Sequence, residues 1–156
     1  MTSAEQEIEL VPVTKSNPNA ISMLLTLGRD YLSESDLSLD ERERFLQSIL
    51  TRQGETDRWL LLLKYEKEHL GFVHMKIDKD GRVGWGFILE FYIIPTKRRL
   101  GWGHKLFSLS LEILRERGVR HIWLLTSPRS ESFWHSLGFR RTGETENGQE
   151  VMTTSI

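Results

Sequence analysis

Apolar residues recur along the chain with two different periods. Every-second-residue alternation or short apolar runs predict strands at residues 7–14, 58–65, 70–78, 83–94 and 119–126 and in a hairpin over 140–155. Helical spacing of apolar residues, with capping and stop signals, predicts helices at 16–32, 38–50, 101–117 and 130–138. This order predicts a mixed α/β (α+β) fold with a mostly antiparallel sheet of six to seven strands and about four helices. The strand-helix-strand passage over 88–125 predicts one right-handed parallel crossover.

Capping and turn residues support these boundaries. Ser38 stands three residues before Glu41, which is the spacing of a capping box at a helix start. Either Ser16 or Asn17 can cap the first helix, and Gly118 is a stop signal for the third. Polar turns are expected at Glu66–His69 and at Asp80–Gly81, and the last hairpin turns at Asn147–Gly148.

Size and composition limit the possible functions. The 156 residues with 38% hydrophobic content predict a single domain, 1–156. A formal charge of -1 argues against nucleic acid as a partner, and the absence of cysteine excludes thiol chemistry. Residues 1–10 lack an apolar signal core and the run Trp59–Leu63 is too short to span a membrane, so we expect no membrane association and a cytoplasmic location. The oligomeric state stays open, with a homodimer as one option.

One segment combines glycines, cations and a helix start. In YIIPTKRRLGWGHKLF, the glycines at 101 and 103 allow a tight turn and a close approach of backbone N–H groups to an anion. The helix dipole adds partial positive charge, and the nearby cations are Lys97, Arg98, Arg99 and Lys105. The alternative is a simple tight turn beside a solvated charged face. The P-loop and dinucleotide-binding motifs are both absent, which argues against nucleotide hydrolases and dehydrogenases.

The same segment resembles the GNAT acyltransferases, the general-control-related N-acetyltransferases. Their signature, Arg/Gln-x-x-Gly-x-Gly/Ala after a strand that ends in proline, is matched by Arg98, Gly101 and Gly103. The stretch SESFWHSLGFRRTGE is similar to the short helix and Leu-Gly-Phe ending of the family. The resemblance implies acetyl-CoA as co-substrate, a primary amine of a small molecule or peptide as acceptor, and N-acetyltransferase activity. It implies acetyl-CoA contacts from Phe91, Ile93, Ile94, Arg98, Arg99, Leu100, Gly101, Trp102, Gly103, His104, Lys105, Ser127 and Trp134.

Glu90 and Tyr92 are the predicted catalytic residues. An amine must be neutral to attack a thioester, and Glu90 is the candidate base that removes its proton. Glu90 and Tyr92 share strand parity and are expected to face the acceptor, unless a bulge intervenes. The alternative is that Glu90 is only a solvated or ion-paired strand residue. Many family members carry, at the position of Trp134, a tyrosine that protonates the departing CoA thiolate. Since an indole cannot act as an acid, Tyr92, His135 or solvent would protonate the thiolate here.

Other charged and histidine residues carry weaker hypotheses. The five histidines show no metal-ligand spacing, so no metal is expected. His74 lies on a strand beside that of Glu90 and could reach the acceptor cleft, but it is interpreted as an ordinary half-buried strand residue. Five acidic residues would suit a cationic acceptor or form a solvated helix face: Glu34, Asp36, Asp40, Glu41 and Glu43. Two alternatives to the enzyme remain: a non-catalytic acyl-CoA-binding module, and an interaction domain that does not bind CoA.

Overall fold

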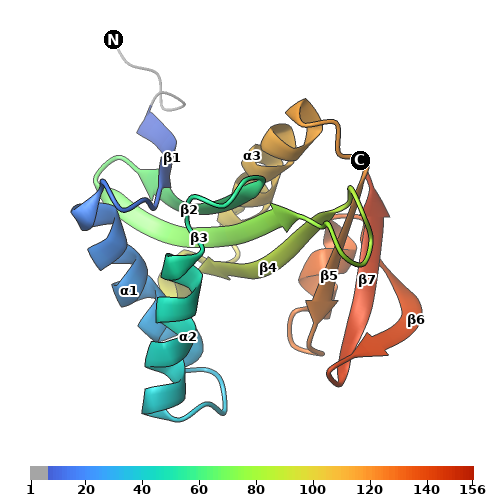
Figure 1. The fold of residues 1–156 in the computed structure, drawn as a ribbon, viewed down its shortest axis with the longest axis horizontal. Helices are drawn as coiled ribbons and strands as arrows, with labels where there is room; N and C mark the ends of the chain where they lie inside the picture. The colour runs from blue at the N-terminus through green and yellow to red at the C-terminus, as the bar shows by residue number, and fades with distance from the viewer. Residues whose placement is uncertain (1–6) are drawn as a thin grey trace. The chain divides into compact units, whose positions relative to one another are not determined.

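The main strands and helices follow one another in the order that the sequence predicts. A computed structural model describes residues 7–156, so the predicted features of the first six residues lie outside it. The elements are β1 Ile8–Pro12, α1 Pro18–Leu32, α2 Leu39–Thr51, β2 Arg58–Tyr65, β3 Glu68–Ile77, β4 Gly86–Ile93, the short 3₁₀ helix η2 Pro95–Lys97, α3 Trp102–Glu116, β5 His121–Thr126, α4 Glu131–Ser136, β6 Arg140–Glu146 and β7 Gln149–Ser155 (Figure 1).

The strands form a sheet in the order β1-β2-β3-β4-β5-β7-β6. One neighbouring pair is parallel: Gly86–Ile88 of β4 lies beside Ile122–Leu124 of β5, with α3 as the crossover between the two strands. The predicted mixed, mostly antiparallel sheet with one parallel crossover is therefore confirmed. The chain divides into two compact units, the first comprising residues up to His74 together with Glu90–Leu106, and the second comprising Met75–Leu89 and Phe107–Ile156.

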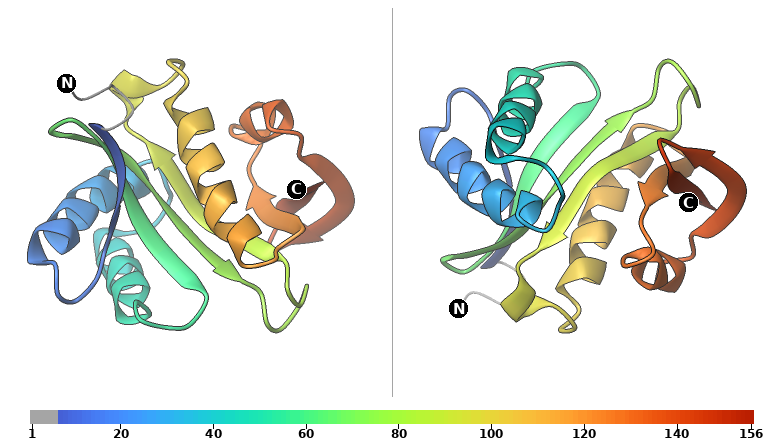
Figure 2. Two further views of the ribbon diagram at one scale, coloured as in Figure 1. Left: turned by 90° about the horizontal axis from the view of Figure 1, so that it is seen from above. Right: turned by 90° about the horizontal axis from the view of Figure 1, so that it is seen from below.

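In the first unit, α1 and α2 lie side by side (Figure 2). The side chain of Asn17, not that of Ser16, caps α1 by accepting a hydrogen bond from Ala20 N at 3.1 Å. The predicted capping box of α2 is present, because the side chains of Ser38 and Glu41 each accept from the other residue's backbone N–H. Both helix starts are thus determined locally, as expected from their sequences.

The core of the first unit joins these helices to β2, β3 and β4. Its buried members are Val13, Ala20, Leu24, Leu27, Ile49, Leu60, Leu62, Phe72 and Tyr92. The helices approach closely at Gly28, where a Cβ would lie 2.5 Å from Leu46 Cδ2. Burial of this apolar surface is the main stabilising contribution in the unit.

A second close approach joins β3 to β4 at Gly71. A Cβ at this position would overlap the carbonyl oxygen of Tyr92 and lie 3.0 Å from both Tyr92 C and Ile93 Cδ1. The obstacle is backbone, which cannot rotate away as a side chain can. Glycine is therefore required here by space, and it lets the end of β4 approach β3 closely.

In the second unit, β5 pairs with β7 and β7 pairs with β6, both antiparallel. The predicted hairpin turn is confirmed, with Asn147 and Gly148 both in the left-handed region at φ 51° and 77°. The rings of Phe107, Trp134 and Phe139 pack edge to face in its interior, with centroids 5.3 to 6.2 Å apart.

The connection from β3 to β4 differs from the prediction. β4 begins at Gly86, not Val83, because the buried side chain of Asp78 organises a loop instead. Its carboxylate accepts hydrogen bonds from the N–H groups of Asp80, Gly81 and Arg82 at 3.0, 3.3 and 2.9 Å. These bonds satisfy backbone groups that a longer strand would have to pair elsewhere. The preceding turn is also shorter than predicted, since β3 already begins at Glu68.

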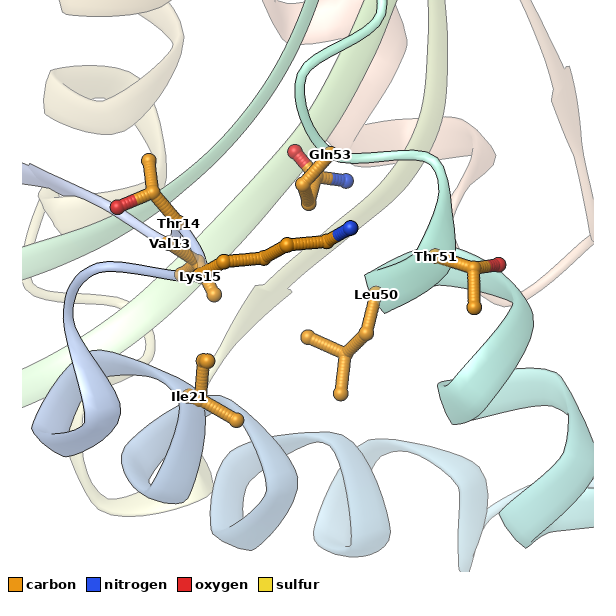
Figure 3. A pocket seen from close by; sticks show the side chains of 7 residues that line it. All are labelled: Val13, Thr14, Lys15, Ile21, Leu50, Thr51 and Gln53. Atoms are coloured by element: carbon orange, nitrogen blue, oxygen red, sulfur yellow. The ribbon is translucent and has the colours of Figure 1, made fainter.

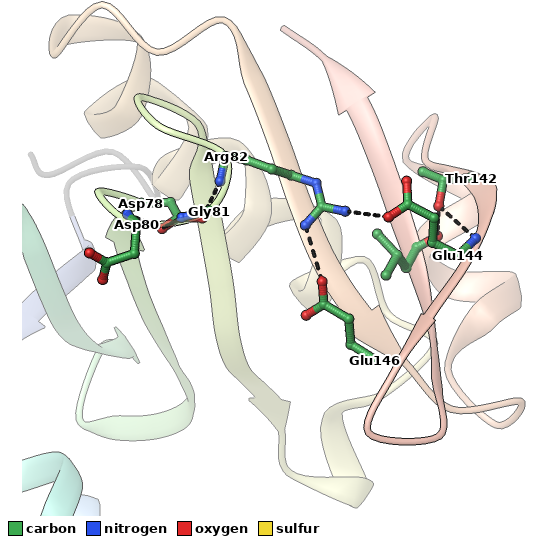
Figure 4. Close-up of polar contacts among 8 residues, drawn as sticks. Asp78, Asp80, Gly81, Arg82, Thr142, Glu144 and Glu146 are labelled. Carbon is green, nitrogen blue, oxygen red and sulfur yellow. Dashed lines mark hydrogen bonds and ion pairs between the residues drawn. The ribbon is translucent and has the colours of Figure 1, made fainter.

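Arg82 holds this loop against β6 and β5 (Figure 4). Its guanidinium pairs with Glu144 at 3.3 Å and Glu146 at 3.5 Å. The same group lies 4.3 Å from the centroid of the Trp123 ring, which is a cation–π distance.

Among residues 7–156, no helix has both the length and the apolar character needed to cross a bilayer.

Candidate active site

The glycine-rich loop leads from η2 directly into α3. Arg99 and Gly101 adopt left-handed backbone conformations, with φ of 64° and 89°. The first turn of α3 closes with Lys105 N donating to Gly101 O at 3.0 Å, so the N–H groups of Trp102 and Gly103 precede the helical bonds. A Cβ on Gly101 would meet nothing within 4 Å, so open space adjoins the turn. The predicted turn is confirmed at Gly101, whereas Gly103 lies within the first helical turn.

Arg98 ties the loop to its surroundings. Its Nε donates to the carbonyl of Ile93 at 2.8 Å, and its Nη2 pairs with Glu34 at 3.3 Å. The guanidinium carbon lies 5.4 Å from the centroid of the Tyr92 ring. Arg98 therefore connects the loop, the end of β4 and the segment after α1.

The other cations of the segment differ in their pairing. Lys97 forms an ion pair with Glu68 at 3.3 Å. Within residues 7–156, Arg99 and Lys105 form no ion pair, so their charges remain available to an anion. At the helix start, the Trp102 ring packs on Tyr65 of β2 with centroids 4.9 Å apart, while Leu100 is 65% exposed and His104 is exposed.

The end of β4 has two of its backbone groups already engaged. The carbonyl of Ile93 accepts from Arg98, and the N–H of Ile94 donates to Leu70 O at 2.9 Å. Phe91 is half-buried and Ile93 is buried. Any hydrogen bond from this strand end to a ligand would therefore use other backbone N–H or C=O groups.

Glu90 and Tyr92 face the same side of the sheet, as their parity predicts. Glu90 contacts His74 and Tyr92 contacts Phe72, and these two partners are two residues apart on β3. Tyr92 is 4% exposed and packs against Tyr31 as well, so it belongs to the core cluster. The catalytic roles of both residues stay predictions.

Glu90 lies at the end of a chain of polar contacts. Its Oε2 is 2.5 Å from Nδ1 of His74, and Nε2 of His74 is 2.8 Å from Nη1 of Arg58. Arg58 also pairs with Glu55 at 3.3 Å. His74 is 2% exposed, so its interpretation as a half-buried strand residue is wrong. The contact also shows that Glu90 is ion-paired or hydrogen-bonded rather than solvated.

Burial perturbs several groups around Glu90. It raises the pKa of Tyr31, with the charges of Glu90 and Glu34 acting in the same direction. It also raises the pKa of Tyr92, to which Asp30 contributes, while Arg98 opposes the rise. Both phenols therefore keep their protons at neutral pH. Burial lowers the pKa of the Arg58 guanidinium from its ordinary value.

The acidic run near α2 is partly used in local contacts. Glu34 pairs with Arg98, Glu41 completes the capping box, and Glu43 pairs with Arg29 at 2.7 Å. These partners reduce the negative charge that the run could offer to a cationic acceptor.

Two predicted residues lie in the second unit. Ser127 directly follows β5, and its carbonyl accepts from the hydroxyl groups of Thr126 and Ser130. Trp134 on α4 is 6% exposed and packs against Phe107 and Phe139. Its apolar packing role is observed, whereas a role next to a thioester remains a prediction.

A surface pocket of about 210 Å³ lies elsewhere in the first unit. Figure 3 shows the Lys15 side chain extended across it, with Gln53 on one side and Leu50 and Ile21 on the other. None of the site residues predicted from the sequence lines this pocket. The candidate site is therefore defined by the loop and by Glu90, not by this hollow.

One family profile matches most of the chain. The sequence profile described as the acetyltransferase (GNAT) family matches residues 21–139. A search of curated proteins found no significant match. Members of the family use acetyl-CoA as co-substrate.

Solved structures of acetyltransferases share the fold. A PaiA N-acetyltransferase from Thermoplasma acidophilum in complex with coenzyme A has a TM-score of 0.74 at 17% identity, covering 96% of this chain and 99% of that one. An acetyltransferase from Thermus thermophilus has a TM-score of 0.71 at 19% identity, covering 96% and 97%. An aminoglycoside 6'-N-acetyltransferase complexed with coenzyme A has a TM-score of 0.74 at 14% identity, covering 94% and 96%. Since the profile spans most of the chain, the protein belongs to the GNAT acetyltransferase family.

Proposed function

We propose that the protein transfers an acetyl group from acetyl-CoA to a primary amine of a small molecule or peptide. The observation that carries this proposal is the loop from Arg98 to Lys105, where a left-handed glycine, a helix start and two cations without ion-pair partners among the described residues come together. Two structures that share the fold were determined with coenzyme A, which supports the same co-substrate here.

The loop would bind the pyrophosphate of acetyl-CoA. The N–H groups of Trp102 and Gly103 come before the helical bonds of α3 and lie at the positive end of its dipole. Arg99 and Lys105 would add full charges, while Arg98 keeps the loop in place through Ile93 and Glu34. The backbone of Phe91 to Ile94 would hold the pantetheine arm through the groups that are not already bonded.

Glu90 would act as the base. Acetyl-CoA supplies an acyl group that is activated as a thioester. Glu90 takes a proton from the acceptor's ammonium group, directly or through water, and the neutral nitrogen then bonds to the acyl carbon as the C–S bond breaks. Tyr92 or water gives a proton to the departing thiolate and takes up the second proton that the nitrogen loses as the amide forms, because the indole of Trp134 cannot act as an acid at working pH.

The alternative is a domain that binds acyl-CoA without catalysis, and Trp134 is the observation that favours it. Calorimetric titration with acetyl-CoA, followed by thiol release with a panel of primary amines, distinguishes the two. Binding with turnover supports the transferase, binding without turnover supports the alternative, and no binding contradicts both.

Replacing Gly101 with valine tests the loop itself. A β-branched side chain at a φ of 89° is strained and fills the open space beside the turn, so we expect acetyl-CoA binding to be lost. Gly118→Val is the matched control, since Gly118 has a φ of 81° with open space at the other end of the same helix. Equal affinity in Gly101→Val and the control would contradict the role of the loop.

A further inference from the structure

Three neighbouring strands each contribute one member to the polar chain that ends at Glu90. Arg58 lies on β2, His74 on β3 and Glu90 on β4, and β3 stands between the other two in the sheet. The Arg58 side chain is 5% exposed, His74 is 2% exposed and Glu90 is 8% exposed. Buried polar groups of this kind are costly unless each is hydrogen-bonded, so their protons must be arranged consistently.

Hydrogen-bond chemistry determines where those protons are. A guanidinium can only donate, so Nε2 of His74 must accept from Arg58 Nη1 and carries no proton. The ring proton is then on Nδ1, which donates to Oε2 of Glu90 at 2.5 Å. Glu90 accepts this bond as a carboxylate, and its other oxygen, Oε1, has no hydrogen-bond partner among the described residues.

We propose that Arg58 and His74 are positioning residues for Glu90: Arg58 selects the His74 tautomer, and His74 holds Oε2 so that Oε1 alone takes the acceptor's proton. This inference rests on the proposed function, because it assumes that Glu90 is the base. It gives the two carboxylate oxygens different roles, one fixed by the protein and one available to the reaction.

The surrounding charges agree with this arrangement. Arg58 is balanced on its other side by Glu55 at 3.3 Å, and Arg52 is a further cation whose charge acts on it. Tyr31, from α1, is a phenol whose pKa is raised, so it stays neutral beside Glu90. The net charge of Arg58, a neutral His74 and Glu90 is zero, which limits the cost of burying the group.

The first test measures the tautomer directly and needs no substrate. Long-range ¹H–¹⁵N spectra of histidine-labelled protein distinguish a protonated from an unprotonated ring nitrogen, and the His74 signals are identified by their loss in His74→Asn. We expect a protonated Nδ1 and an unprotonated Nε2 at neutral pH. In Arg58→Met, a proton should be found on Nε2 in a measurable fraction. A wild-type ring protonated at Nε2 would overturn the proposal.

The second test compares two amides at position 74. The amide nitrogen of asparagine can occupy the place of Nδ1 and donate to Glu90, whereas the amide of glutamine reaches only the place of Nε2 and cannot. We expect His74→Gln to lower kcat roughly 10- to 100-fold with the KM for acetyl-CoA unchanged. His74→Asn should keep most of the wild-type kcat. Simple loss of packing would affect both amides.

His69→Gln is the matched control, because His69 is on the same strand and makes no contact with Glu90. The kcat of this variant should match that of the wild type. Equal activity of the two position-74 amides, with both folded, would overturn the positioning role alone. If His74→Gln does not fold, the ¹H–¹⁵N spectra of the wild type and of Arg58→Met test the proposal instead, because they show which ring nitrogen of His74 carries the proton. A wild-type protein that acetylates no amine would overturn the proposed function and this inference with it.

Discussion

Replacing Gly71 with alanine should destabilise the protein, although the change adds only one methyl group. The new Cβ would overlap the Tyr92 carbonyl oxygen and lie 3.0 Å from Tyr92 C and Ile93 Cδ1, so β3 and β4 must move apart. Overpacking of this kind costs about 1–3 kcal/mol, and a backbone obstacle places the cost at the upper end. Alanine also restricts the unfolded chain, which returns roughly 0.4–1 kcal/mol. The expected net loss is about 2 kcal/mol.

Thermal and urea unfolding of Gly71→Ala measure this loss. At about 2–4 °C per kcal/mol for a domain of this size, Tm should fall by about 4–8 °C. Gly81→Ala is the matched control: the nearest atom to its Cβ is a side-chain oxygen, Asp78 Oδ2, at 3.3 Å, so a clearly smaller loss than in Gly71→Ala is expected. A Gly71→Ala protein as stable as the wild type would refute the argument that backbone crowding requires glycine here.

The remaining predictions concern the base, the acid and the loop after β3. Glu90→Gln keeps the shape and removes the base, so kcat/KM should fall roughly 10- to 1,000-fold near neutral pH with acetyl-CoA binding retained in calorimetry; an unchanged rate at all pH values would exclude the role. Trp134→Phe should retain kcat within roughly tenfold in steady-state kinetics. Tyr92→Phe should cost more when the protein rather than water protonates the thiolate, because the phenol, unlike the indole, can supply a proton. A collapse of kcat in Trp134→Phe, with folding and acetyl-CoA affinity intact, would contradict the packing role. Burial alone would raise the pKa of Asp78, but hydrogen bonds from the N–H groups of Asp80, Arg82 and Gly81 outweigh it and lower that pKa. The ionised Asp78 carboxylate therefore stabilises the folded protein above about pH 4. This contribution to the free energy of unfolding is lost as the pH falls through the folded-state pKa. Asp78→Ala should therefore lower the free energy of unfolding by about 1–3 kcal/mol at pH 7 and by less at pH 3, with Asp80→Ala as control; an equal loss at both pH values would contradict this sign.

Local signals predicted much of the fold. Capping residues such as Ser38 and Glu41 act within one helical turn, so the start of α2 could be predicted from a few neighbouring residues. The loop before α3 could be identified for the same reason, since Gly101, the cations and the helix start are adjacent in sequence. The parity of Glu90 and Tyr92 likewise depends only on strand geometry.

Features that depend on distant residues were not predicted. Arg58, His74 and Glu90 are separated by sixteen residues each, and their contacts exist only once three strands are aligned. The late start of β4 depends on the side chain of Asp78, which takes backbone N–H groups that a strand would otherwise use. The need for glycine at position 71 likewise comes from the opposite strand.

The buried chain from Arg58 to Glu90 also has a consequence for folding. Because strand side chains alternate between faces, a slip of β3 by one residue would turn His74 away and replace it with Val73 or Met75. Arg58 would then lose its acceptor and Glu90 its donor, and leaving one partner of such a pair buried and alone costs about 3–5 kcal/mol. A sheet with β3 shifted by one residue is therefore less stable by that free energy. Leucines at all three positions would make the same shift less costly, because no buried polar group would lose its partner. The residues proposed to prepare the base thus also select one strand alignment over its neighbours.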